Sequence, residues 1–370
     1  MIRVLVVDDS AVVRRLVVDA LAGDPEIEVV GTTANGRVAL AMVDEMSPDV
    51  VTMDIEMPLM DGIEAIRALR RRGNRCRIII FTKTSDQNAK ATFAALAAGA
   101  TEFVTKPSSV ISENATVGML GGSLIQKIKA VVQTGSATTT ERRLGVGTAD
   151  VRTAYGISLA EQPPSRGRPL RAVVIGTSMG GPEALLRVLR RLPRLPVPVA
   201  VVQHMPPVFT RQLAEWLNLV CASTVLESTG REELQPGHVY VAQGDYHLEV
   251  RAATRGAETL VQQDPPVNST RPSIDVLFRS AARVYGGDLL AVLLTGMGND
   301  GLAGCREVVA AGGTVIVQDE ASSLAWGMPG AVAKAGLAHH VLLLDEIGPA
   351  IVATAQRHRV VGLASTEGQG

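Results

Sequence analysis

The sequence predicts an α/β protein with two doubly wound, parallel-sheet domains. At 370 residues the chain is longer than one hydrophobic core usually organises. Its composition, 46% hydrophobic but only 3% aromatic, favours cores of Val, Ala, Leu and Ile, which suit parallel sheets covered by helices. In both halves, short β-branched runs alternate with Ala- and Leu-rich helical patterns, and this alternation is typical of βα units.

The first predicted domain spans residues 1–133. Five runs predict its strands, and a candidate helix follows each: IRVLVV, EVVGTT, DVVTM, RIIIFT and TEFVT. Functional residues of such a sheet are expected beyond the carboxyl ends of the strands.

Residues 134–168 lose hydrophobic periodicity and are rich in Ser, Thr, Gly, Pro and Arg, which predicts a flexible linker. From Leu170 the alternation resumes, so we expect a second domain over residues 169–360 and a C-terminal tail over 361–370. Within this domain, turn signals and short alternating runs predict an inserted hairpin region, in GHVYVAQGDYHLEV and ETLVQQD.

Composition also excludes several classes of protein. A net charge of −1 provides no general attraction for nucleic acid or anionic lipid, so no nucleic-acid partner is expected. Cys76, Cys221 and Cys305 are far apart and lack metal-site spacing, which argues against a disulfide framework or a thiolate metal site. The N-terminus is unlike a signal peptide and no run approaches the ~18 apolar residues of a membrane span, so we expect a cytoplasmic protein.

Polar residues follow the predicted strands of the first domain at the same edge of the sheet: Asp8, Asp9, Asp54, Thr82 and Lys106. Carboxylates from two strands can hold Mg²⁺ and leave one carboxylate as a nucleophile toward phosphate, for which Asp54 is the best candidate. A hydroxyl and an ammonium can then contact the phosphoryl oxygens. Taken singly, Asp9 or Ser10 could cap a helix and Lys106 could be a solvated charge; their convergence favours a site.

The segments DDSAVVRR, VTMDIEMPLMDG, FTKTS and FVTKP resemble the receiver domains of two-component response regulators. The resemblance implies a flavodoxin-like fold in which Asp54 accepts phosphate from a histidine kinase. It further implies a set of metal-site residues (Asp9, Asp54, the carbonyl of Glu56, and Asp8 nearby) and a set of switch residues (Thr82, Lys106 and Phe103). Phe103 could equally be plain core.

In the second domain, the segment Gly176–Pro182 follows a strand and opens a helix as G-x-S-x-G. Small glycines permit a sharp turn that exposes Ser178, and backbone N–H groups at the helix start can stabilise an oxyanion. A phosphate-binding loop and a helix cap are the alternatives.

A nucleophilic serine needs a base and an acid that orients the base. His204 ends the next strand, and Asp300 follows the apolar strand LLAVLL, so both are expected at the same sheet edge as Ser178. Alone, His204 is ambiguous and Asp300 could belong to an ordinary turn. Cys305 lies in a helical pattern and is predicted to be a buried thiol rather than a nucleophile.

The segments IGTSMGGPEAL, QHMPPVFTRQLAEWLN, PPVNSTRPSIDVLF, LTGMGNDGLAG and ASSLAWGMPGAV resemble the catalytic domain of the chemotaxis protein-glutamate methylesterases. The resemblance implies a Ser178, His204 and Asp300 triad that needs no cofactor. The resemblance also implies that this triad would act on glutamate methyl esters and on certain glutamines of chemoreceptors, releasing methanol or ammonia. Backbone N–H groups of Met179, where many members have Thr, and of Met297 would form the oxyanion hole.

The two resemblances together predict an esterase switched by phosphorylation, which meets the membrane only through its receptors. We expect the unphosphorylated receiver to hinder access to the catalytic edge. A response regulator that acts only by partner docking is the rival interpretation. A DNA-binding output is disfavoured because no basic recognition helix follows the linker.

Overall fold

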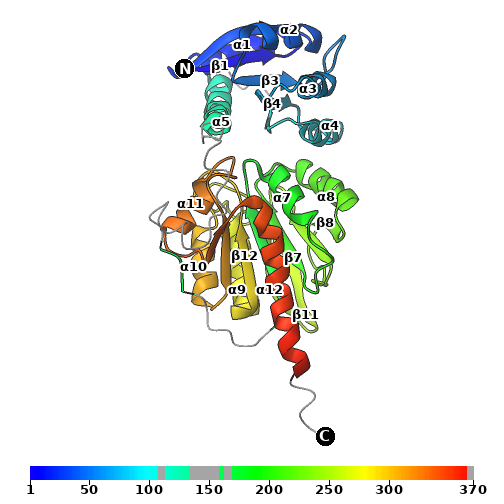
Figure 1. Cartoon of the computed structure of the whole chain (residues 1–370), viewed down its shortest axis with the longest axis vertical. Coiled ribbons are helices and arrows are strands. Elements are labelled where there is room, and N and C mark those ends of the chain that lie inside the picture. The colour runs from blue at the N-terminus through cyan, green and yellow to red at the C-terminus, as the bar shows by residue number, and fades with distance from the viewer. Residues whose placement is uncertain (107–112, 134–157, 162–168, 365–370) are drawn as a thin grey trace. The chain divides into compact units, whose positions relative to one another are not determined.

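The computed structural model describes residues 1–106, 113–133, 158–161 and 169–364. The chain divides into two compact units, Met1–Thr138 and Thr139–Gly370, and each contains its own parallel sheet (Figure 1). The predicted linker lies largely outside the described residues, so the predicted domain boundaries stay predictions. Only residues 158–161 of the predicted linker are described, and there Ala160 N donates to Ala338 O (2.9 Å) within the second unit.

The first unit alternates strands and helices as predicted. Its strands are β1 (Ile2–Val7), β2 (Ile27–Thr33), β3 (Val50–Asp54), β4 (Arg77–Thr82) and β5 (Glu102–Thr105). Its helices are α1 (Ala11–Leu21), α2 (Gly36–Met46), α3 (Gly62–Arg71), α4 (Asp86–Ala97) and α5 (Glu113–Gln133). The strands are parallel in the order β2-β1-β3-β4-β5, which confirms the predicted doubly wound sheet.

Local sequence explains where these helices begin. Ser10 Oγ accepts the Val13 N–H at the start of α1, so Ser10 caps this helix. Helix capping was one of the two interpretations that the sequence left open for Asp9 and Ser10. Asp61 and Glu64 form a capping box at the start of α3. Because β1 and β3 are neighbours in the sheet, the residues that follow them meet at one edge.

The second unit also alternates strands and helices. Its strands are β6 (Ala172–Thr177), β7 (Val199–Gln203), β8 (Thr224–Ser228), β9 (His238–Ala242), β10 (His247–Ala253), β11 (Gly256–Gln262), β12 (Leu289–Leu293), β13 (Thr314–Gln318) and β14 (His340–Leu342). Its helices are α7 (Gly181–Leu189), α8 (Phe209–Val220), α9 (Ile274–Tyr285), the short η2 (Gly286–Asp288), α10 (Leu302–Ala310), α11 (Gly327–Lys334) and α12 (Leu344–Ala364).

The main sheet of this unit is parallel, in the order β14-β13-β12-β6-β7-β9-β8. The predicted hairpin region is divided between two sheets. β10 and β11 form the expected antiparallel hairpin, whereas GHVYVA supplies β9, which pairs in parallel with β7. β9 is buried over most of its length, as expected of a strand inside a parallel sheet rather than in a hairpin.

Helices cover both faces of this sheet. α9 packs against α10 and against the β10 strand of the hairpin, while α7 packs against α12 (Figure 1). α12 continues to Ala364, four residues into the segment predicted as a tail. Among the described helices, none is both long enough and apolar enough to cross a lipid bilayer.

Candidate active site and phosphorylation site

Ser178 lies immediately beyond β6, at the turn into α7. β6 and β7 pair in register up to Thr177 and Gln203, so Ser178 and His204 are the next two residues along these neighbouring strands. The His204 N–H donates to Thr177 O (3.1 Å) and extends the pairing by one step. Gly180 has a φ of 73°, a conformation that favours glycine, and it makes the sharp turn possible.

His204 and Asp300 are in direct contact. His204 Nε2 lies 2.8 Å from Asp300 Oδ2, and the two side chains are 13% and 3% exposed. This contact uses Nε2 and leaves Nδ1 for any exchange with Ser178, the reverse of the chymotrypsin arrangement. Within the described residues, the Ser178 hydroxyl makes no hydrogen bond; in unliganded enzymes such catalytic bonds are often long.

Asp300 is held at the N-terminus of α9. Besides His204, its carboxylate accepts from several groups: Ile274 N (2.7 Å), Asp275 N (3.2 Å), Ser273 Oγ (2.8 Å), Asn268 Nδ2 (2.8 Å) and Thr270 Oγ1 (3.4 Å). The helix dipole favours an anion at this position. Burial opposes ionisation, but the hydrogen bond and charge of His204, with these further donors, hold the pKa of Asp300 well below its usual range.

Asn268 and Asp275 belong to this site although sequence reasoning did not select them. Asn268 Nδ2 donates to both Asp300 Oδ1 and Asp275 Oδ2, each at 2.8 Å. Asp275 accepts the Gly304 N–H (2.6 Å) at the start of α10, just as Asp300 accepts N–H groups at the start of α9. The two helix N-termini therefore share a pair of buried carboxylates. Burial raises the pKa of Asp275, and the charge of Asp300 adds to this effect.

Two loops bring backbone donors near Ser178. Within the described residues, the structure records no acceptor for the N–H of Met179 or of Met297. A Cβ on Gly296 would lie 2.8 Å from Ser178 Cβ, so glycine at 296 lets the loop that carries Met297 approach the serine closely. Thr295 Oγ1 donates to Met179 O (2.9 Å) and joins the two loops. The geometry is suited to an oxyanion hole.

Three further side chains of the second unit have structural roles. His247 is buried, accepts from Ser273 N at Nδ1 (3.2 Å) and lies 3.1 Å from Pro265 O through Nε2. Arg271 directs its guanidinium to the Asp245 carboxylate and to backbone carbonyls. Cys305 is fully buried, and burial raises its thiol pKa, which fits an inert cysteine.

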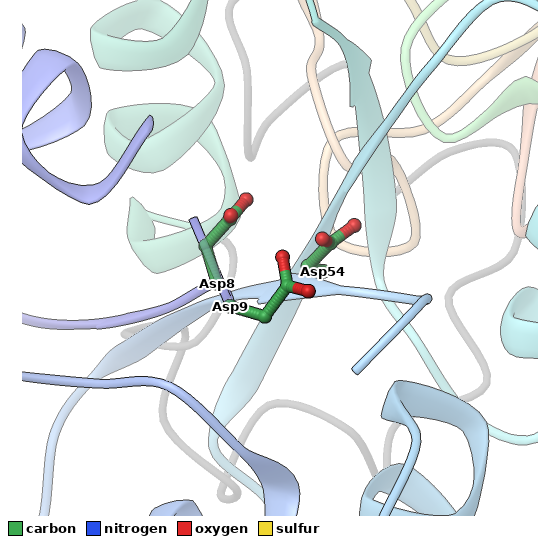
Figure 2. Close-up of side chains that lie close together, drawn as sticks. All are labelled: Asp8, Asp9 and Asp54. Carbon is green, nitrogen blue, oxygen red and sulfur yellow. The ribbon is translucent and has the colours of Figure 1, made fainter. Parts of the chain in front are cut away.

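In the first unit, Asp8 and Asp9 follow β1 and lie beside Asp54, the last residue of β3 (Figure 2). One carboxylate oxygen from each lies within 4.8 Å of the others. Lys106 Nζ forms ion pairs with Asp8 Oδ2 (2.7 Å) and Asp54 Oδ2 (2.8 Å). A set of carboxylates is the donor chemistry that Mg²⁺ prefers, so these residues fit such an ion.

The electrostatics of Asp54 also fit a cation. Burial raises the pKa of Asp54, and the negative charge of Asp8 acts in the same direction, while Lys106 opposes both. The pKa of Lys106 is itself raised: burial favours the neutral amine, but its hydrogen bonds to Asp54 and Asp8 outweigh burial. A divalent ion would relieve the repulsion between the two carboxylates.

The remaining predicted switch residues lie close to this edge. Thr82 is buried at the end of β4, and its carbonyl accepts the Lys106 N–H (2.6 Å). Phe103 is also buried and pairs with Ile80 in β4 rather than with Thr82. The side chain of Glu56 is half exposed and lies 3.9 Å from Lys83 Nζ; the group that the resemblance implies for the metal site is its backbone carbonyl.

Each half of the chain matches a known family of domains. Residues 4–113 match the response regulator receiver domain, and residues 173–351 match the CheB methylesterase domain. A protein-glutamate methylesterase/protein-glutamine glutaminase from a Nocardioides species is 50% identical, over 97% of this chain and 96% of its own length. The one from Trichodesmium erythraeum is 39% identical, over 95% and 98%.

Among solved structures, the Thermotoga maritima CheB methylesterase catalytic domain is 40% identical, with a TM-score of 0.49, and covers 50% of this chain and 97% of its own. The two domain matches, over residues 4–113 and 173–351, define a response regulator whose second domain is a methylesterase. The chain belongs to the family of protein-glutamate methylesterases/protein-glutamine glutaminases.

Proposed function

We propose that this methylesterase is a serine hydrolase whose receiver domain controls it by phosphorylation. Its substrates are glutamate methyl esters on chemoreceptors, which are hydrolysed to glutamate and methanol, and receptor glutamines, which are deamidated. The observation that carries the proposal is the 2.8 Å contact between His204 and Asp300, a carboxylate held by several further donors. Ser178 and His204 are each one residue beyond the last β6–β7 pair.

His204 accepts the Ser178 proton at Nδ1 while the Ser178 oxygen attacks the ester carbonyl. Asp300 remains ionised, holds the Nε2–H and stabilises the imidazolium. The N–H groups of Met179 and Met297 bind the developing oxyanion, and each such donor is worth roughly 10²–10³ in rate by comparison with other hydrolases. Methanol leaves with the proton from His204, and water then hydrolyses the acyl-enzyme by the same steps.

The same acyl chemistry serves a glutamine substrate. Ammonia then replaces methanol as the leaving group, and the acyl-enzyme is identical. One triad therefore accounts for both activities in the names of the relatives.

In the receiver, we propose that Asp54 accepts a phosphoryl group from a histidine kinase. Asp9, Asp54 and the carbonyl of Glu56 would hold Mg²⁺, with Asp8 nearby, and the ion would supply positive charge at the phosphoryl oxygens. Lys106 then exchanges its contact with Asp54 for the phosphoryl group, and Thr82 contacts the same group. Phe103 would move with Thr82. Phosphorylation relieves a restraint that the receiver imposes on the esterase domain.

Methanol release from methylated receptor fragments tests the proposal. The full chain is expected to release methanol, and Ser178→Ala is expected to release none above background. Ser280→Ala, which removes a buried hydroxyl bonded to Leu277 O on α9, is the matched control and should remain active. A small phosphodonor should raise the rate of the wild type but not of Asp54→Asn. Full activity of Ser178→Ala would contradict the proposal, whereas the docking-module rival predicts no methanol from any variant.

A further inference from the structure

Gln203, the last residue of β7, bonds to the backbones of two proposed catalytic residues. Its side chain is 2% exposed. Nε2 donates to Ser178 O at 2.8 Å and to His204 O at 3.1 Å. An amide NH₂ group has two hydrogens, so a single nitrogen can serve both carbonyls. The side chain touches neither the serine hydroxyl nor the imidazole through these bonds.

The other end of the same amide is unpartnered. Gln203 Oε1 is buried and accepts no hydrogen bond within the described residues. It faces Gly181, where a Cβ would lie 1.8 Å from the oxygen. A buried carbonyl without a donor is destabilising, so the benefit of this amide lies in its two donated bonds.

The Ser178 peptide is thus held from both neighbouring strands. On the β12 side, Ser178 N donates to Thr295 O (3.0 Å). On the β7 side, Gln203 holds Ser178 O. Because Gln203 also holds His204 O, it connects the backbone of the nucleophile directly to that of the base.

We propose that Gln203 is a positioning residue that fixes the distance between the side chains of Ser178 and His204 by holding their two backbones together. The inference rests on the proposed function of these two residues. Gln203 acts through their backbones and not on the substrate, so its loss is expected to lower kcat and leave KM unchanged.

The test measures how fast the full-length protein reacts with a small fluorophosphonate, which modifies activated serines, and compares kcat and KM on a p-nitrophenyl ester. Gln203→Met has similar size and shape but no donors. A misplacement of about 1 Å can cost on the order of 10²-fold in rate, so we expect a loss of roughly 10- to 100-fold in labelling rate and kcat.

Tyr240→Phe is the matched control. Tyr240 is also 2% exposed, and its hydroxyl makes two backbone hydrogen bonds, to Glu233 O (2.7 Å) and from Gln235 N (3.0 Å). Its loss should lower thermal stability but keep the labelling rate within about twofold of wild type, because it touches no proposed catalytic residue. Equal labelling rates for Gln203→Met and Tyr240→Phe, both folded, would overturn the inference.

If Gln203→Met does not fold, Gln203→Glu decides. Burial keeps that carboxyl protonated, so it offers one donor instead of two, and the labelling rate should fall between those of wild type and Ser178→Ala. A wild-type rate for this variant would contradict the inference. Ser178→Ala separates the two claims: labelling that persists there removes the proposed function, whereas labelling lost there but normal in the Gln203 variants removes only the role of Gln203.

Discussion

Asp54 is the last residue of a strand in one parallel sheet, and Asp300 lies in the loop after a strand of the other. Both aspartates are buried, but their surroundings move their pKa values in opposite directions. Asp300 accepts from backbone N–H groups of α9, from neutral side chains and from His204. Asp54 has Lys106 and the Ile55 N–H, and it faces the negative charge of Asp8.

Burial raises the pKa of both carboxyls, so the difference in direction comes from the larger number of donors around Asp300. The anion of Asp300 is fully satisfied, which suits a group that must stay ionised while it stabilises a charged imidazole. The anion of Asp54 has fewer donors and faces the negative charge of Asp8, which suits a nucleophile that receives a cation and a phosphoryl group.

The largest expected effect comes from removing the negative charge of Asp300, which tests whether this carboxylate must stay ionised for catalysis. Asp300→Asn should reduce kcat for methanol release by on the order of 10⁴, as expected when the base loses its orienting anion. Steady-state kinetics on methylated receptor fragments measure the effect, with Asp264→Asn, a change on a different segment, as the control. A loss smaller than tenfold would mean that Asp300 only caps α9.

Loss of the carboxylate should destabilise only the unit that contains Asp300. At neutral pH, Asp300→Asn should lower the free energy of unfolding of the second unit by about 2–3 kcal/mol, because charge-assisted hydrogen bonds are lost. Asp54→Asn should leave the first unit unchanged or more stable by up to about 1 kcal/mol, because it relieves repulsion from Asp8. Denaturant unfolding of the full chain, followed by probes in each unit, measures both. Changes of equal sign and size would contradict the comparison.

The pH dependence sharpens the same contrast. The folded pKa of Asp300 is lowered, so its stabilisation is present above the unfolded value of about 3.9 and is lost as pH falls through the folded pKa. The folded pKa of Asp54 is raised, so stability is lost as pH rises from the unfolded value through the folded pKa. Subtracting the unfolding profiles of Asp300→Asn and Asp54→Asn from the wild type should give slopes of opposite sign; slopes of the same sign would refute the assignment.

Magnesium should act on one site only. At ten times its dissociation constant, Mg²⁺ should stabilise the first unit by about 1.4 kcal/mol and leave the second unchanged. Thermal unfolding with and without Mg²⁺ measures this, and Asp9→Asn should abolish the shift. Asp44→Asn, which removes an exposed carboxylate paired with Arg72, is the matched control and should keep it. An unchanged shift in Asp9→Asn would exclude the proposed ligand set.

The smallest effect is expected at Asn268. Asn268→Ala removes the donor that Asp300 and Asp275 share, and kcat should fall about fivefold, equivalent to about 1 kcal/mol. Gln263→Ala, which loses only a 3.3 Å contact to Asp245, should not change kcat. A wild-type kcat for Asn268→Ala would show that the other donors suffice to hold Asp300.

The sequence was informative where chain topology alone decides position. Parallel strands bring their carboxyl ends to one edge of the sheet. Residues after predicted strands, such as Asp54 and His204, can therefore be chosen as site candidates from the sequence alone. The supporting residues could not, because their roles depend on tertiary packing. Asn268 and Asp275 matter only because α9 packs against α10, and Gln203 looks like the last polar residue of a strand. The turn signals around β9 predict a hairpin although its apolar run suits a strand inside a parallel sheet.

The central claim, that Ser178 is a nucleophile activated by His204, is tested most directly by locating a covalent adduct. After reaction of the full chain with a fluorophosphonate, peptide mass spectrometry should find one adduct, on Ser178, and none in Ser178→Ala. His204→Ala should slow its formation by several orders of magnitude. An adduct on another residue, or equal labelling in Ser178→Ala, would contradict the account.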